Sequence, residues 1–236
     1  MAIGRGILTS PDGITWDNRT SGTTNFNDVI YANNTFVTVG NSSVGSYGTI
    51  FTSPDGITWD NRTPDITNLN YLNAVTYGNG LFVTVGESGT ILTSTDGTTW
   101  TERTSGTSEY PSGVTYGNGL FVMVDKDGII LTSPDGTSWD NRTSGTSNIL
   151  YGVTYGNSTF VGVGSGGRII TSSDNGTSWD NRTSGTSKYL YEVTYGNGTF
   201  VTVGYSGTIL TSSDGISWDN RTSGTSNILY GVTYSQ

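Results

Sequence analysis

The sequence predicts an all-β protein, a six-bladed β-propeller whose blades each have four antiparallel strands. Three observations predict it. A phrase of eight or nine residues ending in tryptophan occurs six times along the chain. It recurs roughly every 40 residues, the period typical of a propeller blade. The residues between the phrases form short β-branched or aromatic runs separated by glycine-rich turns, and no segment shows a capped helical period.

Two phrases carry the repeat through the whole chain. The first reads Thr-Ser-Pro-Asp-Gly-Ile-Thr-Trp over residues 52–59. The second reads Val-Thr-Tyr-Gly-Asn and includes Tyr77, Tyr116, Tyr155 and Tyr195; it is altered at Tyr31 and cut short at Tyr234. No linker or low-complexity segment interrupts the array. We therefore expect residues 1–236 to form a single domain.

Each repeat predicts four strands, here named A to D. In residues 191–224 these are Tyr191–Tyr195, Thr199–Val203, Thr208–Thr211 and Ser217–Thr222. Each is a β-branched or aromatic run of the usual strand length. The intervening Gly, Asn, Ser and Asp residues are those that tight hairpin turns require.

The two ends of the chain supply complementary parts of one blade. Residues 1–4 align with strand B at residues 201–204, and Leu229–Tyr234 repeats strand A. We expect a composite blade with strand A from the C-terminus and strands B, C and D from the N-terminus. Such a blade closes the ring and pairs strand edges that would otherwise be exposed.

The composition excludes several classes of function. Of 236 residues, 32% are hydrophobic and 35 are glycine, with no cysteine or histidine and a net charge of −9. The chain therefore lacks thiolate chemistry and the commonest general base and metal ligand. Its acidity disfavours nucleic acid, and no apolar stretch is long enough to span a bilayer. We expect no cofactor, no metal and no membrane insertion, and no signal peptide is visible.

The tryptophan phrase resembles the Asp-box, or BNR repeat, of sialidase-like β-propellers, which reads Ser-x-Asp-x-Gly-x-Thr-Trp. Residues 172–179 match it best, with Ser178 in place of threonine. The other five copies are one residue shorter, which is similar to repeat proteins of bacteria and phages and to Ycf48-type propellers. The resemblance covers the whole chain. It implies that the phrase is the turn between strands C and D, and that strand A lines the axis.

The box residues are expected to be structural. An aspartate in a turn accepts hydrogen bonds from its own backbone, glycine supplies the positive φ of a tight hairpin, and the indole fills the space beneath the turn. These residues are Asp12, Trp16, Asp55, Trp59, Asp96, Trp100, Asp135, Trp139, Asp174, Trp179, Asp214 and Trp218.

A sialidase would need three arginines around the substrate carboxylate, a tyrosine nucleophile with a glutamate partner, and an acid/base aspartate. Six arginines instead follow the tryptophans by three residues, on strand D: Arg19, Arg62, Arg103, Arg142, Arg182 and Arg221. We expect them to pair with nearby aspartates or to pack between blades. The remaining basic residues, Arg5, Lys126, Arg168 and Lys188, lie outside strand A.

A glycosidase of another kind would need two carboxylates close together. Asp28 and Glu192 occupy the same repeat position at the start of strand A. The simpler interpretation is that both are solvated acids at a loop edge. We therefore expect no enzymatic activity, and the glycosidase is the third and weakest hypothesis.

Variation among the repeats is concentrated in the B–C and D–A loops, which alternating strand direction places on one face. Diversity on one face of a rigid scaffold is typical of a binding surface, although neutral drift also explains it. We predict a recognition module for a glycan or a surface protein, monomeric unless it belongs to an appendage. The alternative is a structural or assembly propeller of a phage or cell-surface appendage, or a docking platform. The candidate ligand-binding residues are Phe26, Asp28, Tyr47, Glu87, Glu109, Tyr110, Lys126, Arg168, Lys188, Tyr189, Glu192 and Tyr205.

Overall fold

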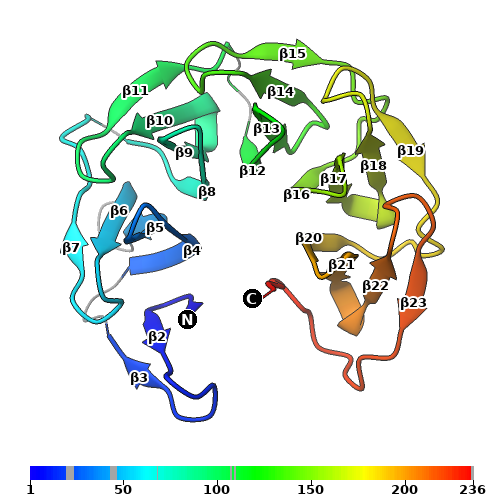
Figure 1. Cartoon of the computed structure of the whole chain (residues 1–236), viewed down its shortest axis with the longest axis horizontal. Coiled ribbons are helices and arrows are strands. Elements are labelled where there is room, and N and C mark those ends of the chain that lie inside the picture. The colour runs from blue at the N-terminus through cyan, green and yellow to red at the C-terminus, as the bar shows by residue number, and fades with distance from the viewer. Residues whose placement is uncertain (20–23, 43–46, 68, 107, 109, 235–236) are drawn as a thin grey trace. The chain divides into compact units, whose positions relative to one another are not determined.

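The computed structural model describes residues 1–19, 24–42, 47–67, 69–106, 108 and 110–234. It divides into two compact units, residues 1–111 and 112–236. Both units are built of antiparallel β-sheets (Figure 1). In the described part of the chain, no helix is long and apolar enough to cross a membrane.

Unit 1 contains a three-stranded sheet and two four-stranded sheets. The three-stranded sheet consists of β1 (Ala2–Ile3), β2 (Ile7–Thr9) and β3 (Asp17–Asn18). The second sheet consists of β4 (Thr24–Ala32), β5 (Thr35–Ser42), β6 (Gly48–Ser53) and β7 (Asp60–Asn61). The third consists of β8 (Leu72–Gly78), β9 (Leu81–Gly86), β10 (Thr90–Ser94) and β11 (Thr101–Thr104).

Unit 2 contains three four-stranded sheets, the first of which begins at the unit boundary. That sheet consists of β12 (Pro111–Gly117), β13 (Leu120–Asp125), β14 (Ile130–Ser133) and β15 (Asp140–Arg142). The next consists of β16 (Leu150–Gly156), β17 (Thr159–Gly164), β18 (Ile169–Ser172) and β19 (Asp180–Arg182). The last consists of β20 (Leu190–Gly196), β21 (Thr199–Gly204), β22 (Ile209–Ser212) and β23 (Asp219–Arg221).

The observed strands follow the predicted order A to D. In the last sheet, β20 and β21 match the predicted A and B within a residue, whereas the outer strand β23 is shorter than the predicted Ser217–Thr222. The sequence did not predict three single-turn 3₁₀ helices in the B–C loops, at Glu87–Gly89, Ser165–Gly167 and Tyr205–Gly207. Their middle residues have left-handed backbones, which lets each loop reverse within three residues.

Each end of the chain forms part of a blade. The three-stranded sheet has the predicted B, C and D strands, while residues 229–234 are assigned to no strand. They nevertheless lie beside the last sheet as an inner strand does: Leu229 N donates to Gly204 O, at the end of β21, at 3.1 Å. The Tyr234 ring also covers Gly196 as the Tyr195 ring covers Gly156. The predicted pairing of the two ends would join the two units, so it stays a prediction, as does the single domain.

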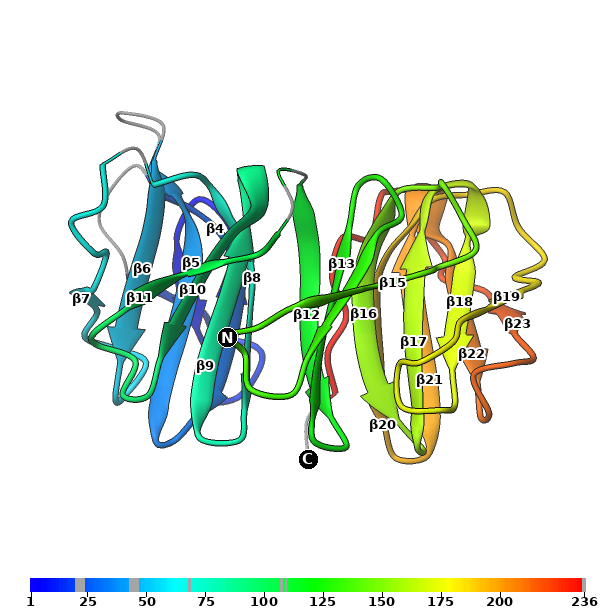
Figure 2. The same ribbon diagram turned by 90° about the horizontal axis from the view of Figure 1, so that it is seen from above.

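The core runs through the middle strands of the sheets. Strands β9, β13 and β17 are almost entirely buried, and the four phenylalanines Phe82, Phe121, Phe160 and Phe200 are fully buried. In each of these sheets a strand A tyrosine packs on the phenylalanine, which packs on the Trp that directly precedes strand D. Figure 2 shows the strands edge-on with their turns and loops at the two ends. The rigid strands therefore hold the loops that carry the variable residues.

Candidate functional site

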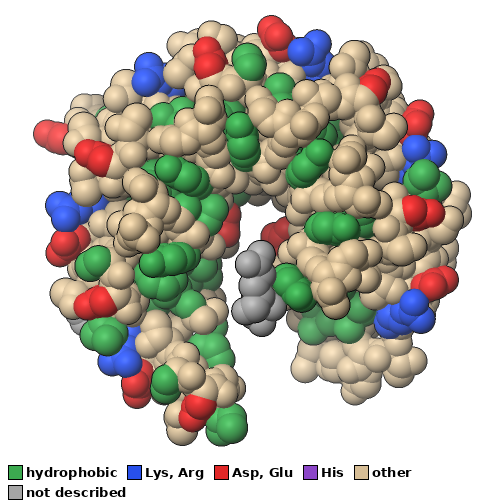
Figure 3. Space-filling model, in the orientation of Figure 1, with side chains coloured by type: hydrophobic (Ala, Val, Ile, Leu, Met, Phe, Trp, Pro, Cys, Tyr) green, Lys and Arg blue, Asp and Glu red, His purple; other side chains and the backbone are tan. Residues whose placement is uncertain are grey.

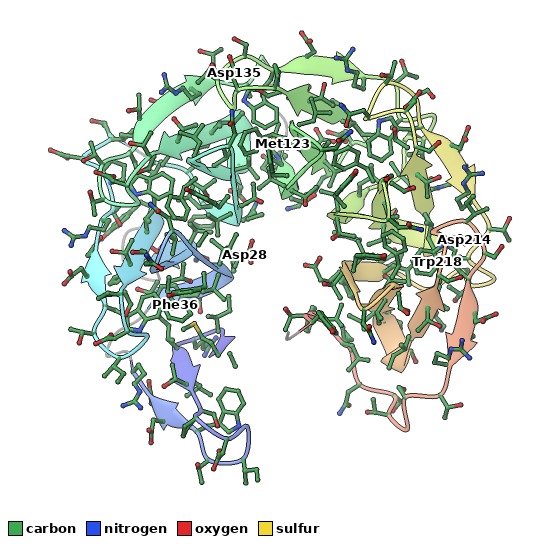
Figure 4. The ribbon with its side chains drawn as sticks, in the orientation of Figure 1. Asp28, Phe36, Met123, Asp135, Asp214 and Trp218 are labelled. Atoms are coloured by element: carbon green, nitrogen blue, oxygen red, sulfur yellow. The ribbon has the colours of Figure 1, made fainter. Side chains whose placement is uncertain are left out.

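The six repeated turns are held by their aspartates. In the second copy, Asp55 Oδ1 accepts from Ile57 N at 2.8 Å and from Thr58 N at 2.9 Å, while Ser53 Oγ donates to the same oxygen. Gly56 has φ +74°, and its N–H donates to Ser53 Oγ at 2.7 Å. The aspartate side chain thus accepts hydrogen bonds from backbone N–H groups that have no backbone acceptor in the tight turn. Figure 4 shows Asp214 and Trp218 together at one of these turns.

These hydrogen bonds favour the charged form of the turn aspartates. The backbone N–H groups of Thr58 and Ile57 lower the pKa of Asp55 to about 2. The Ser178 hydroxyl and N–H lower the pKa of Asp174 to about 2. Because their oxygens are engaged in the turn, these carboxylates serve the fold. Among the described residues, no group of three or more acidic side chains is arranged to hold a metal ion.

The tryptophans pack under the same turns. Trp59, Trp100, Trp139 and Trp218 each donate from Nε1 to the carbonyl of the turn glycine, at 3.0–3.3 Å. Trp179 differs, since its buried Nε1 has no partner among the described residues. Its turn is one residue longer, as its sequence indicated. The extra residue, Asn175, adopts φ +58°.

The repeated arginines lie on the outermost strands. Each guanidinium Nε donates to a strand C threonine, as Arg182 does to Thr171 Oγ1 at 2.7 Å. Five also pair with the aspartate two residues earlier, as expected, at 2.6–3.4 Å. Figure 3 shows these opposite charges along the outer strands. The sequence did not indicate the threonine partners.

Two candidates in unit 1 have a different environment from the one expected. The expectation that Phe26 lies on an exposed loop is wrong: it belongs to β4, is buried, and packs edge-on against Phe51 at 5.5 Å. Asp28 also lies within β4, where Figure 4 labels it. Its two carboxylate oxygens accept from Val29 N at 2.7 Å and from Val75 N at 2.8 Å. Asp28 thus connects two neighbouring inner strands, β4 and β8.

Burial changes the acidity of Asp28. It raises the pKa of the carboxyl to about 6, and the two N–H donors only partly offset this effect. The other candidates lie on the surface to different degrees: Tyr47, Tyr110 and Lys126 are exposed and Glu87 is half-buried. Glu109 lies outside the described residues.

Four of the remaining candidates in unit 2 belong to a group of tyrosines or lie beside it. Tyr151, Tyr189, Tyr191, Tyr205 and Tyr230 form what we call the tyrosine cluster. The Tyr191 ring centroid lies 5.2 Å from Tyr151, 5.3 Å from Tyr230 and 6.4 Å from Tyr189. Burial raises the pKa of Tyr191, and the nearby phenols of Tyr230, Tyr189 and Tyr205 raise it further.

The cluster is open to solvent. Tyr189, Tyr205 and Tyr230 are 47%, 46% and 69% exposed, so a large part of each ring faces solvent. Tyr151 and Tyr191 are half-buried and form its floor. An exposed group of contiguous rings is typical of a binding surface rather than of a core.

A β-bulge places the floor of the cluster. Strands β16 and β20 each shift register at their second residue, which leaves Tyr151 and Tyr191 without a ladder partner. A bulge re-aims the side chain it carries. The equivalent residue in β4 is Asn27, which donates from Nδ2 to Leu72 O at 2.8 Å. Tyrosine at this position therefore replaces a hydrogen bond between strands with a ring that packs on the neighbouring tyrosines.

Sequence reasoning found Tyr189 and Tyr205 but missed Tyr151, Tyr191 and Tyr230. The signal was present as the dipeptide Leu-Tyr at residues 150–151, 190–191 and 229–230. It was missed because the alternation of side chains along a strand does not reveal a one-residue bulge. These tyrosines were therefore interpreted as ordinary residues of strand A rather than as part of a surface.

Charged and polar groups border the cluster. Lys188 Nζ lies 5.6 Å from the centre of the Tyr205 ring, a cation–π contact. Glu192 accepts from Val193 N at 2.9 Å. Arg168 is held by two amide oxygens, with Nη1 donating to Asn181 at 2.8 Å and Nη2 to Asn148 at 3.2 Å. Four candidates, Lys188, Tyr189, Glu192 and Tyr205, thus belong to one region of unit 2.

Comparison with known proteins supports the fold. A family model described as the DUF6242 beta propeller domain matches residues 10–110. No curated protein is similar enough to count as a match. Among solved structures, YCF48 bound to D1 peptide is 19% identical, with a TM-score of 0.67 over 88% of this chain and 71% of that one.

Two further structures give the same result. YCF48 from Cyanidioschyzon merolae is 16% identical, with a TM-score of 0.71 over 95% of this chain and 81% of that one. A chain of a nidogen/laminin complex is 14% identical, with a TM-score of 0.68 over 90% of this chain and 88% of that one. At such identities the likeness concerns the fold alone. The chain is an all-β protein with the β-propeller fold, and its six sheets are the blades.

Proposed function

We propose that this propeller is a non-catalytic recognition module that binds glycans through the tyrosine cluster of unit 2. The observation that carries the proposal is the contiguous set of exposed rings on rigid strands. Loops and strand ends on a rigid scaffold are the usual place for a binding site. Tyrosine suits such a site because it offers a large contact area at low conformational cost.

The chemistry of the cluster suits a sugar. The C–H faces of a pyranose ring pack on aromatic rings, while its hydroxyls need donors and acceptors close by. The cluster offers both: five phenols with their own hydroxyls, the ammonium of Lys188 and the carboxylate of Glu192. Binding sites of this kind combine an apolar floor with a few polar groups that fix orientation.

The proposal includes no catalytic step. The resemblance to Asp-box propellers of the sialidase type would require arginines around a substrate carboxylate. Here the repeated arginines are engaged on outer strands, as Arg142 is with Asp140 and Thr132. Asp28 is likewise engaged, because both of its oxygens accept backbone hydrogen bonds.

A protein surface is the second candidate ligand. Two of the solved structures with this fold are YCF48 bound to D1 peptide and a nidogen/laminin complex. Exposed tyrosines are also enriched in protein interfaces. We favour the glycan because the phenol hydroxyls, Lys188 and Glu192 accompany the rings with the hydrogen-bonding groups that a sugar requires.

A glycan array tests the proposal. The full chain should bind at least one class of glycan on the array, and Tyr205→Ala should weaken that binding by about tenfold, which corresponds to about 1.4 kcal/mol. Tyr205 is suited to the test because its side chain is 46% exposed and lies in the turn Tyr205–Gly207, so its removal leaves the core intact.

The matched control is Tyr47→Ala, since Tyr47 is 44% exposed and belongs to unit 1, outside the cluster. It should bind as the unmodified chain does. Absence of binding to every glycan, or equal losses in the two variants, would count against the proposal.

A further inference from the structure

Three rings of the tyrosine cluster form a regular row. Tyr151, Tyr191 and Tyr230 occupy the same position in three successive repeats of unit 2. Their centroids are separated by nearly equal steps of 5.2 and 5.3 Å. The row therefore presents the same chemical group at a constant interval, set by the distance between neighbouring inner strands.

A regular row of identical rings fits a ligand that is itself a repeating chain. We infer, building on the proposed glycan-binding function, that the ligand is a linear glycan of pyranose rings joined through equatorial bonds, lying along the row. Equatorial linkages extend the chain as a ribbon, so that successive sugars advance by about one ring length and each keeps a face for stacking. Axial linkages coil the chain and carry successive sugars away from the row.

The tilt of the rings indicates a single chain rather than a crystalline surface. Tyr151 and Tyr191 are inclined by 52°, and Tyr191 and Tyr230 by 35°. Rings that bind the flat face of a polysaccharide crystal would need to lie in one plane. Rings inclined to one another can instead each stack on a different sugar of one flexible chain.

The charges around the row favour an uncharged chain. Lys188 is directed to the Tyr205 ring, and Glu192 adds a carboxylate beside the row. The chain as a whole carries a net charge of −9. A polyanionic glycan would be repelled by this field, which acts over about 10 Å at moderate ionic strength.

Isothermal titration with oligosaccharides of one to six sugars tests the inference. Two equatorially linked series serve as probes, cello-oligosaccharides and chito-oligosaccharides, and the stronger binder identifies which sugar the site prefers. The affinity of that series should rise by about tenfold per sugar, or about 1.4 kcal/mol, up to three sugars and then level off. Maltohexaose, with axial linkages, should bind at least tenfold more weakly than the hexasaccharide of the preferred equatorial series. Microcrystalline cellulose should bind less protein than an equal mass of soluble cello-oligosaccharides.

The middle ring provides the matched variants. Tyr191→Ala should remove the gain between one and three sugars, whereas Tyr191→Phe should keep most of it, with circular dichroism confirming that both variants are folded. Equal affinity for one sugar and six, or for maltohexaose and the equatorial series, would overturn the inference while leaving the proposed glycan binding intact. No binding to any glycan would overturn both.

Discussion

At the scale of single residues, the pKa of an aspartate is lowered in one environment of this protein and raised in another. The turn aspartates accept several hydrogen bonds at the surface, and the pKa of Asp55 falls to about 2. Asp28 accepts two hydrogen bonds in a half-buried position within β4, where loss of solvation dominates and its pKa rises to about 6. The turn aspartates therefore stabilise the fold when charged, while Asp28 carries a cost when charged.

This difference predicts how stability depends on pH. Above pH 7 Asp28 is ionised in both the folded and the unfolded chain, so the burial cost is fully present. As the pH falls through 6, the folded chain takes up the proton first, and the free energy of unfolding should rise by about 2 kcal/mol by pH 4.5. Urea unfolding of the full chain at several pH values between 4.5 and 8 measures this change.

The control is Asp28→Asn, which cannot ionise. Its stability should change less over the same pH range than that of the unmodified chain. The comparison isolates Asp28, because burial also raises the pKa of Asp125. Identical pH profiles for the two proteins would show that Asp28 carries no such cost. Below pH 4 the sign reverses, because the unfolded chain takes up protons at the turn aspartates before the folded chain does, where the pKa values of Asp55 and Asp174 are about 2.

At the scale of elements, neighbouring inner strands contact each other through a glycine and a tyrosine. A Cβ added to Gly156 would lie 2.1 Å from Cγ of Tyr195, and the same clash arises between Gly117 and Tyr155 and between Gly196 and Tyr234. The glycine in the Tyr-Gly-Asn phrase is therefore required by the close approach of the next strand's ring. The phrase encodes packing between blades as well as a turn.

Gly156→Ala should destabilise the protein by more than about 2 kcal/mol, because a fixed ring must move out of a packed position. Ile216→Ala is the control, since the Ile216 side chain is 50% exposed and lies in a turn of the same unit. Its effect should stay within about 0.5 kcal/mol. Chemical unfolding of the two variants measures the contrast, and similar losses would refute this packing role.

The bounds of the strands and turns also show how much of the fold could be predicted from the sequence. The strands of residues 191–224 were located to within two residues, because β-branched runs bounded by glycine and asparagine turns leave few alternatives. The bulge at Tyr191 and the 3₁₀ turn at Tyr205–Gly207 could not be predicted. Both depend on one extra or one left-handed residue, which the period of a strand does not reveal.

At the scale of the whole molecule, the repeated phrases predict the fold. The candidate site combines one repeated tyrosine position with tyrosines in the variable loops. Phe26 was expected at the surface because it precedes a predicted strand, yet β4 begins earlier and buries it. Tyr189 and Tyr205 were identified from loop variation, but their grouping with Tyr191 depends on contacts between successive repeats. The candidate site was therefore only partly predictable, since its members lie far apart in the sequence.

The most direct test of the central claim is to locate the bound glycan by NMR. The full chain, labelled with ¹³C in its tyrosine rings and assigned with single Tyr→Phe variants, would be titrated with the strongest glycan ligand. The rings of Tyr151, Tyr189, Tyr191, Tyr205 and Tyr230 should shift with one common dissociation constant, while those of Tyr31, Tyr47 and Tyr77 should not. Shifts confined to tyrosines outside the cluster would contradict the claim that this surface is the recognition site.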